Sequence, residues 1–446
     1  RTLRIVLTPV NCLVIQSLLS PRHYDARRLI ALKVVFPTCC GVDVHKRFLV
    51  ATIITTSADS VQPHYQKKRF STFNSDLNRF ADWLRANDCL DVCMESTGKY
   101  WVPVFNILEK RGIRTVIANP KWVKAVKGNK DDTKDSKWIG DLFRMGLVKS
   151  SFIPAKEIRI LRELTRYRYK LTSMKSSEKN RYQNAFTVCN VALDSVVSDM
   201  FGKSASAITE YLTSDENFDV QHCVSLLRGS LRKKADDVLE AIEGYEISAE
   251  QKTRIGIVRD HLQYIEKLIE RVDACINTMM AQYEDYSSLL CTIPGIDRSS
   301  SITILSEIGT DMSQFVSSKR LCCWAGLTPG NNESAGKKKS VRISRAGVYL
   351  KPALVQVAHA AVKDKQHPYY ALKYERIQKR RGKKRAIIAI ARMILTAIFS
   401  MLSTGEIWNP SDLFKVDMPD QLKEKQLAKA VKQAVRFLEK QGLKVS

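Results

Sequence analysis

The fold of the N-terminal part is decided by residues 38–55, which read TCCGVDVHKRFLVATIIT. Two β-branched, apolar runs, at 40–44 and 48–55, are separated by the short polar segment HKR. Runs of this length and composition are typical of strands, and a short polar connection between them is typical of a hairpin. We therefore expect two antiparallel strands here.

Two more strands and three helices are expected before residue 150. The strands are predicted over 90–94 and 114–118. An initial hairpin followed by alternating helices and strands predicts an α/β domain with the outline of a ribonuclease H-like domain. The helices are predicted over 75–86, 101–110 and 135–145.

Four carboxylates stand at the ends of these elements. Asp43 lies in GVDVHK at the end of the first strand, and Glu95 directly follows the strand over 90–94. Asp132 and Asp135 lie in NKDDTKDSKWIGDL, where the last helix begins. A fold that brings strand ends and a helix start together gathers like charges, which need a counter-cation to stay ionised. Because oxygen ligands suit hard divalent ions, we predict a Mg²⁺ site formed by the four acids.

A magnesium site of this kind suits the cleavage of phosphodiester bonds. A metal ion polarises the phosphate, and a pair of ions holds the attacking and leaving oxygens about 3.5–4 Å apart. Acids at a helix start also complement the helix dipole. The alternative is therefore structural, with Asp132 capping the helix that Asp135 enters.

Length and charge limit the class of protein. The 446 residues suffice for two or three hydrophobic cores. Lysine and arginine number 72 against 46 acidic residues, which gives a formal net charge of +26. A positive field of this size attracts polyanions with salt-sensitive affinity, so nucleic acid is the leading partner and a merely soluble basic protein is the alternative. Residues 331–400 hold 17 lysines and arginines against three acids, more than half of the net charge.

The eleven cysteines and seven histidines show neither zinc-ligand spacing nor a disulfide framework. We interpret the cysteines as reduced, mostly buried thiols of a cytoplasmic protein. The apolar stretch over 386–402 is short for a membrane span and contains Arg392, so we expect a core helix and no membrane partner. Residues 1–33 are interpreted as a non-native or disordered extension.

The middle of the chain is predicted to be helical. From residue 158 to about residue 215 arginine and tyrosine interleave, and Arg166, Arg168 and Lys170 are candidate contacts to a nucleic-acid backbone. A solvated helix face is the alternative. A later helix carries apolar residues at alternating spacings of three and four, which predicts a coiled coil with either the 156–190 helix or another protomer. This seam consists of Ile255, Val258, Leu262, Ile265, Ile269, Val272, Ile276 and Met279.

IPGIDRSSSITILSEIG, residues 293–309, reads as a tight turn that enters a helix near Ser299. This shape resembles helix-hairpin-helix elements, whose backbone N–H groups meet phosphates, and it equally fits a simple loop-to-helix junction. Near the C-terminus an apolar stripe predicts a basic amphipathic helix that serves as a docking element. The stripe consists of Leu427, Val431, Val435 and Leu438.

A candidate nucleophile lies in GLTPGNNESAGKKKSVRISRAG, residues 326–347. Ser334 stands between two glycines in a predicted loop and is followed by five cations. A hydroxyl attacks well when its proton is removed and its target phosphate is neutralised, so this setting suits covalent attack on DNA. A turn residue is the alternative, and Ser340 and Ser344 compete for the role. These cations and those of RRGKKR are candidate nucleic-acid contacts: Lys337, Lys338, Lys339, Arg342, Arg345, Arg380, Arg381, Lys383, Lys384 and Arg385.

Several motifs resemble, in the same order, those of the DEDD-type insertion-sequence transposases, also called bridge-RNA-guided recombinases. The similarity extends from about residue 34 to residue 402. Its motifs are GVDVHK, MESTGKYWVPV, ANPKWVKAVKGNKDDTKDSKWIGDLFRMGLVKSSFIP, LTRYR, TIPGI, LSEIGTDMSQF, WAGLTPGNNESAGKKK and SRAG.

The resemblance implies a RuvC-like N-terminal domain in which Asp43, Glu95, Asp132 and Asp135 hold Mg²⁺. It also implies a C-terminal transposase domain whose serine maps onto Ser334 and attacks a DNA strand to form a phosphoserine link. In the implied assembly, dimers form a tetramer around a noncoding guide RNA that pairs with donor and target DNA, and the two centres meet across protomers.

Two departures from the family pattern lie beside the last acids. Ser136 stands where the family often has alanine, and Asp131 adjoins Asp132, although the flanking residues favour Asp132. The predicted organisation is an extension over 1–33, a RuvC-like domain over 34–155, a helical or coiled-coil region over 156–286, a mainly helical transposase domain over 287–403 and a tail over 404–446.

The sequence thus predicts a DNA transposase or recombinase. Two alternatives stay open. One is a RuvC-like, structure-specific nuclease that uses only the acids, and the other is a non-catalytic nucleic-acid-binding scaffold descended from such an enzyme.

Overall fold

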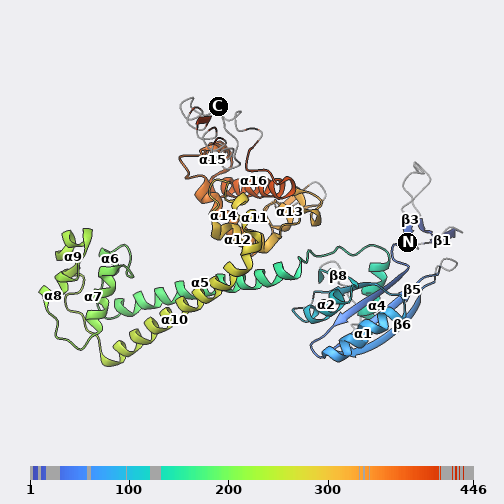
Figure 1. Cartoon of the computed structure of the whole chain (residues 1–446), viewed down its shortest axis with the longest axis horizontal. Coiled ribbons are helices and arrows are strands. Elements are labelled where there is room, and N and C mark those ends of the chain that lie inside the picture. The colour runs from blue at the N-terminus through green and yellow to red at the C-terminus, as the bar shows by residue number, and fades with distance from the viewer. Residues whose placement is uncertain are drawn as a thin grey trace. The chain divides into compact units, whose positions relative to one another are not determined.

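The computed structural model divides the chain into two compact units, residues 1–153 and 154–446 (Figure 1). The structure describes residues 4–8, 12–16, 31–57, 62–96, 98–120, 132–330, 332–334, 337–340, 342–410 and 412, with Glu424, Leu427, Ala428, Val431 and Val435. Side chains are described throughout except at 4–8, 12–16, 31–33, 132–134, 332–334 and 337–340.

The first unit is built on a five-stranded mixed sheet. Its strands are β4 (Thr38–Val44), β5 (Phe48–Thr55), β6 (His64–Ser71), β7 (Asp91–Glu95) and β8 (Arg114–Ala118), and its helices are α1 (Asn74–Ala86), α2 (Trp101–Lys110) and α4 (Asp132–Arg144). The strand order is β6-β5-β4-β7-β8. β4 and β5 form the predicted hairpin and β6 extends it antiparallel, whereas β7 and β8 are parallel to β4. The mixed α/β class predicted from the sequence is confirmed.

Helices cover both faces of this sheet. Alternate residues of a strand point to opposite faces. Cys40 and Val42 of β4 belong to the core shared with α1 and α2, whereas Cys39 packs with Ile139 and Phe143 of α4. The odd-numbered residues of β4 therefore face α4, and this face carries the candidate site.

The extension predicted over residues 1–33 contains three described strands. They are β1 (Arg4–Thr8), β2 (Cys12–Gln16) and β3 (Ala31–Lys33). They form an antiparallel sheet in the order β1-β2-β3 that is separate from the five-stranded sheet.

The second unit begins with a long helix, α5 (Lys156–Thr187), that packs along a second one, α10 (Ala249–Met280) (Figure 1). Polar contacts between them join residues whose numbers rise along α5 and fall along α10, so the two helices are antiparallel. The seam predicted on α10 therefore has its partner in the same chain. The contacts are Arg168–Asp273, Lys175–Glu266 and Glu178–His261.

A small helical cluster lies between α5 and α10 in the sequence. Its elements are α6 (Leu193–Val196), α7 (Lys203–Thr213), α8 (Val220–Ser225), the 3-10 helix η2 (Gly229–Lys234) and α9 (Ala235–Glu240). Apolar residues such as Leu193, Ile208 and Leu212 join Phe186 of α5 and Ile255 of α10 in one continuous core. The cluster and the adjoining ends of the long helices thus fold around a core of their own.

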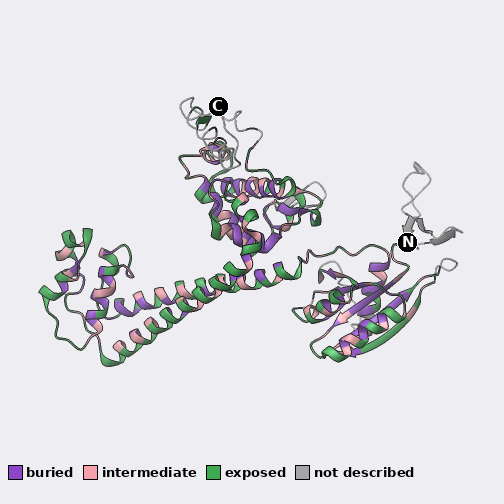
Figure 2. Ribbon diagram, viewed as in Figure 1, coloured by how far each residue is buried: buried purple, intermediate pink, exposed green. Residues whose placement is uncertain are grey.

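The rest of the second unit is a helical core with one small hairpin. Its elements are η3 (Ala281–Tyr283), α11 (Glu284–Leu290), α12 (Arg298–Ile308), η4 (Met312–Gln314), α13 (Ser318–Trp324), β9 (Asn332–Ser334), β10 (Lys337–Ser340), α14 (Leu350–Ala361), α15 (Tyr369–Arg381) and α16 (Lys383–Thr404). α12 is largely buried, as the purple ribbon in Figure 2 shows.

α16 carries the apolar stretch that was predicted to be a core helix. It packs against α13, α14 and α15, and Ile387, Ile390, Ile394 and Ile398 are buried. Among the described helices, α16 is long and apolar enough to cross a membrane by length and composition alone. Its buried face gives it the packing of a core helix, as predicted.

The turn before α12 faces the interior. Ile293 and Ile296 are buried, and a Cβ atom on Gly295 would lie 2.6 Å from the backbone nitrogen of Ala361 in α14. These residues pack within the core, and binding of phosphate by the backbone of this turn stays a prediction. The α12 helix is capped by Asp297, which accepts from the backbone N–H of Ser300.

The amphipathic helix predicted near the C-terminus is described at five positions. Leu427, Val431 and Val435 are helical there, and Leu427 and Val431 are exposed. Leu438 lies outside the described residues.

Candidate functional site

Asp43 and Glu95 lie side by side at the ends of two adjacent parallel strands. Val42 of β4 pairs with Met94 of β7, so the two acids are the next residues in the same register. Val42 and Met94 belong to the core under α1 and α2, whereas Cys93 belongs to the core under α4. Because side chains alternate along a strand, both carboxylates point to the face that α4 covers.

The helix α4 begins at the same edge of the sheet. Ser136, near the start of α4, lies against Gly41, whereas the carbonyl of Arg144 at its end accepts from the backbone N–H of Val35, which precedes β4. The contacts move toward the start of β4 as α4 proceeds, so the helix is antiparallel to the strand. Its first turn therefore lies toward Asp43.

Both acids of the second predicted pair lie in this first turn. Asp132 is the first residue of α4 and Asp135 follows three residues later, partly exposed. Residues three apart lie on one side of a helix. The side chain of Asp132 lies outside the described part of the chain, and within that part no three His, Cys, Asp or Glu side chains form a group that could hold a metal ion. The structure thus brings together the elements that carry the four acids, and their binding of Mg²⁺ stays a prediction.

His45 is a neighbour of the site that the sequence reasoning missed, although it stands in GVDVHK. Its Nε2 atom lies 3.1 Å from Oδ2 of Asp43, whose side chain is 14% exposed. An imidazole at this distance restricts the orientation of the Asp43 side chain.

The close packing of α4 on β4 depends on two glycines. A Cβ atom on Gly41 would lie 2.1 Å from the carbonyl oxygen of Ser136 and 2.3 Å from the nitrogen of Gly140. A Cβ atom on Gly140 would lie 2.6 Å from Cδ1 of Ile54.

The buried hydroxyls of Thr52 and Ser136 share a hydrogen bond of 2.8 Å, so the serine at the position where the family often has alanine has a partner.

Ser334 is the last residue of β9 and pairs with Lys337, the first residue of β10. The loop predicted here is wrong for the described residues, because 332–334 and 337–340 pair as an antiparallel hairpin with an irregularity between Lys338 and Ser340. The side chains of Ser334, Ser340 and the three lysines of β10 lie outside the described part of the chain. The role of Ser334 stays a prediction.

The base of this hairpin is closed by two glycines. Gly326 and Gly347 have φ angles of +70° and +67°, a region that glycine adopts far more readily than other residues. A Cβ atom on Gly326 would lie 2.6 Å from the carbonyl oxygen of Ala346, and one on Gly347 would lie 2.2 Å from that of Ala325. The segments before and after the hairpin therefore meet backbone to backbone, which determines where the hairpin leaves the helical core.

The two arginines predicted as nucleic-acid contacts on α5 have partners within the chain. Arg166 donates from Nε and Nη2 to the two carboxylate oxygens of Glu307 at 2.6 and 2.8 Å, and Glu307 is buried. Arg168 forms a two-point pair with Asp273 of α10, which raises the pKa of its guanidinium group. Lys170 is exposed. For the two arginines the structure shows a structural role, and nucleic-acid contact stays a prediction.

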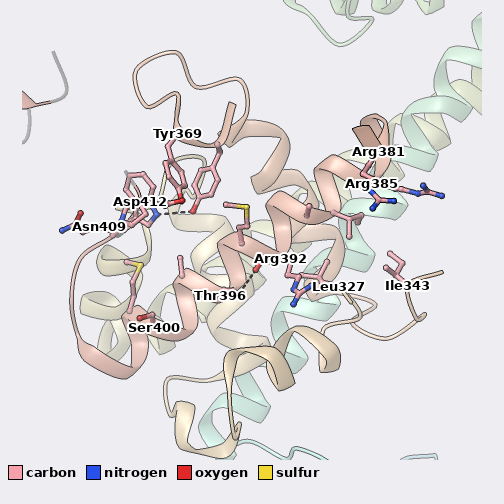
Figure 3. Close-up of a pocket in the computed structure, with 18 of the residues that line it drawn as sticks. Leu327, Ile343, Tyr369, Arg381, Arg385, Arg392, Thr396, Ser400, Asn409 and Asp412 are labelled. Carbon is pink, nitrogen blue, oxygen red and sulfur yellow. Dashed lines mark hydrogen bonds between the residues drawn. The ribbon is translucent and has the colours of Figure 1, made fainter. Parts of the chain in front are cut away.

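The basic group of RRGKKR lies where α15 ends and α16 begins. Arg381, Lys384 and Arg385 line a cavity of about 1300 Å³ along α16, together with Arg342 and Arg392 (Figure 3). Arg392 was not among the predicted contacts, because its apolar surroundings in the sequence indicated only a core helix. Among the predicted cations whose side chains are described, the exposed ones are Lys170, Arg342, Arg345, Arg380, Arg381, Lys383, Lys384 and Arg385.

The four thiols of the first unit whose side chains are described, those of Cys39, Cys40, Cys89 and Cys93, are buried. Burial raises the pKa of Cys89 and of Cys93 to about 12, and it raises the pKa of Cys39 and Cys40 well above the usual range. The ten cysteines whose side chains are described are free, and most are buried, as predicted.

Two family models match the chain. A transposase model of the DEDD IS110 type matches residues 40–190, and a model of the Transposase IS116/IS110/IS902 family matches residues 287–375. The first match contains all four acids, and the second contains the hairpin with Ser334. The chain belongs to the IS110 family of transposases.

Curated relatives of this IS110-family transposase include proteins of three bacteria. The pilin gene-inverting proteins of Moraxella bovis and Moraxella lacunata are each 36% identical over 125 residues, 26% of this chain and 36% of theirs. The transposase for insertion sequence element IS1111A of Coxiella burnetii is 22% identical over 328 residues, 71% of this chain and 79% of the relative. The alignment thus spans about a third of the gene-inverting proteins and most of the IS1111A transposase.

Proposed function

We propose that this transposase cuts and rejoins DNA through a covalent link to Ser334, assisted by Mg²⁺ held by Asp43, Glu95, Asp132 and Asp135. The observation that carries the proposal is the convergence of β4, β7 and the first turn of α4 at one edge of the sheet. The strand order and the mixed strand directions support a RuvC-like domain.

The donor set at this edge fits a hard divalent cation. Asp43 and Glu95 supply carboxylate oxygens from adjacent strand ends, and Asp135 supplies another from the helix start. When bound, Mg²⁺ would polarise the scissile phosphate and offset its charge. The contribution of the chain is to hold these oxygens in place before the DNA arrives.

The proposed serine step exchanges one phosphodiester for another. The Oγ atom of Ser334 forms a bond to phosphorus while the bond from phosphorus to one deoxyribose oxygen breaks. The serine proton is lost, and the leaving oxygen takes up a proton, so no oxidant, reductant or nucleotide is consumed. Attack by the hydroxyl group of another strand reverses the step and frees the serine. The lysines at 337–339 follow the serine in the sequence, where positive charge favours the transition state of phosphoryl transfer.

The proposed partners are DNA, a noncoding guide RNA and further copies of the chain, as a dimer and a synaptic tetramer. The net charge of +26 supports binding of polyanions. The names of the relatives, gene-inverting proteins and a transposase, support a DNA rearrangement as the outcome. The RNA and the tetramer are proposed from the family resemblance.

Ser334→Ala tests the covalent step, with Ser340→Ala as the matched control on the same hairpin. We expect Ser334→Ala to abolish both strand exchange and the protein–DNA adduct that survives denaturation by detergent, since no oxygen is left to attack. Ser340→Ala should retain both. Full strand exchange by Ser334→Ala would eliminate the covalent role and favour a nuclease that uses only the acids.

A further inference from the structure

The cavity along α16 is an open-ended site between that helix and the base of the serine hairpin (Figure 3). Its floor on α16 is apolar and consists mainly of Ile388, Ala389, Met393 and Ala397. Leu327 and Ile343 line it from the hairpin side, and aromatic residues that include Tyr369 and Trp408 line its far end. A cavity of about 1300 Å³ exceeds the size usual for a small-molecule site, so the occupant is expected to be part of a polymer.

Five cations and two acids, Glu406 and Asp412, line this cavity, so its lining carries a net positive charge. In the described part of the chain, none of Arg381, Lys384, Arg385 and Arg392 forms an ion pair, whereas Asp412 on the opposite side is held by Lys373 and by Tyr369. Lys384 and Arg385 stand in the first turn of α16, where the helix dipole disfavours cations. An anionic occupant would remove this electrostatic cost.

The cations form a row rather than a single cluster. Arg385 and Arg392 are seven residues apart on one helix, which corresponds to about 10 Å at 1.5 Å per residue. Figure 3 shows Arg381 and Arg385 at one end of the cavity and Tyr369, Asn409 and Asp412 at the other. A row of cations beside an apolar and aromatic floor is the combination that binds single-stranded nucleic acid, with phosphates on the cations and bases on the floor.

The cavity leads to the serine hairpin. Pro329 and Ile343 form a bridge at the base of the hairpin, and the backbone N–H of Gly330 donates to the carbonyl of Arg342 at 3.1 Å. Pro329, Arg342 and Ile343 all line the cavity. A strand bound along α16 would therefore reach the base of the hairpin that carries Ser334.

We propose that this groove holds an unpaired stretch of the DNA strand that Ser334 attacks. The inference rests on the proposed function, because it takes the attacked strand to be DNA. A duplex does not fit this groove, because its bases are paired and stacked on each other and cannot contact the apolar floor. Unpaired bases cover the floor while their phosphates meet the four cations.

The basic C-terminal segment of the chain is a poor occupant of this groove. Residues 421–446 contain seven lysines and arginines against two glutamates, so their charge has the same sign as that of the groove. Charge complementarity therefore favours a polyanion over this segment.

Fluorescence anisotropy with the full-length protein tests the proposal. The probes are labelled dT12, a duplex of the same length and rU12. Ala389→Trp fills the floor, Arg392→Gln removes a cation without changing the floor, and Lys319→Gln on α13, outside the groove, is the matched control. We expect Ala389→Trp to weaken dT12 binding about tenfold or more, and Arg392→Gln to lower the slope of log affinity against log salt by about 0.7. Duplex affinity should change less than twofold, and Lys319→Gln should leave dT12 binding unchanged.

Three results would overturn the proposal. One is unchanged dT12 binding in both groove variants while their circular dichroism and thermal melting stay native. A second is a loss of oligomer mass in Ala389→Trp without loss of dT12 binding, which would identify an interface between protein copies. The third is a loss confined to rU12, which would assign the groove to RNA. Because binding requires no catalysis, an active Ser334→Ala variant would refute the serine chemistry and leave the binding result intact.

Discussion

The acids of the first unit and the serine of the second are held in different ways. Asp43 and Glu95 stand on neighbouring strands in the middle of a five-stranded sheet that helices cover on both faces. Ser334 stands near the tip of a hairpin of two very short strands, which is marginally stable on its own. Close backbone contacts at Gly326 and Gly347 hold the base of this hairpin in position. A hydrophobic core therefore holds the strands that carry the two acids, whereas the proposed nucleophile is positioned by backbone contacts at the base of its hairpin.

The largest expected effect breaks the acidic site without disturbing its scaffold. Asp43→Asn keeps the size of the side chain but removes the charge that a cation needs, so strand exchange should fall by about 10³ while nucleic-acid binding changes less than twofold. Asp91→Asn at the opposite end of β7 is the control and should stay active. Parallel exchange and anisotropy assays provide the measurement. Retained exchange in Asp43→Asn would contradict a role for this carboxylate in the reaction.

Gly41→Ala should break the packing on which the acids depend. The new methyl group would meet the backbone of α4 at 2.1 Å, so the helix must move, at a cost of about 3 kcal/mol. Hydrogen exchange of β4 amides should accelerate and strand exchange should fall. Gly256→Ala on α10 is the control: it meets open space and should stabilise by up to about 1 kcal/mol. Unchanged protection of β4 in Gly41→Ala would contradict the close approach of α4.

Gly347→Ala should disturb the backbone contacts at the base of the serine hairpin and leave the acidic site unchanged. Its positive φ and the contact at 2.2 Å to the carbonyl oxygen of Ala325 predict a local cost of about 2 kcal/mol. Strand exchange should fall while hydrogen exchange in β4 stays as in the parent. If exchange activity survived intact, the position of the hairpin base would not matter for the reaction.

Ser136→Ala is expected to have the smallest effect, and it tests whether the packing beside the acids tolerates a small change. It introduces the residue that the family often has and leaves the buried hydroxyl of Thr52 without its present partner, at a cost of about 1 kcal/mol. Denaturant unfolding should show this loss, and strand exchange should stay within twofold. A large loss of activity would give Ser136 a direct role beside the acids.

Elements with a strong apolar pattern and clear ends were predictable from the sequence. The strand over 48–55 and the helix over 101–110 agree with β5 and α2 residue for residue. β6 had no such pattern, because HYQKKRFS is a largely exposed edge strand. The serine hairpin was missed for a similar reason, since its strands are short and polar. The partner of the α10 seam could not be chosen, because an apolar repeat describes one helix, whereas Arg168 and Lys175 of α5 identify the other.

The sequence allowed the residues of the candidate site to be predicted, but not the strand pairing and helix packing that bring them together. Asp43 and Glu95 were recognisable because each ends a strand, but their adjacency requires β4 to pair with β7, which is distant in the sequence. The close approach at Gly41 involves residues about a hundred positions apart, so no local pattern indicates it. Arg392 was hidden because its neighbours in the sequence are apolar.

The length of the antiparallel pair formed by α5 and α10 depends directly on the number of residues in each helix. Each helix has 32 residues, which corresponds to about 48 Å of rise. The chain goes out along one helix and comes back along the other, so the distal helical cluster stays attached however long the two helices become. Removing seven residues from each helix, at facing positions, would shorten the helix pair by about 10 Å and preserve the faces that pack together. The length of the helix pair can therefore change by whole heptads without altering which faces pack together.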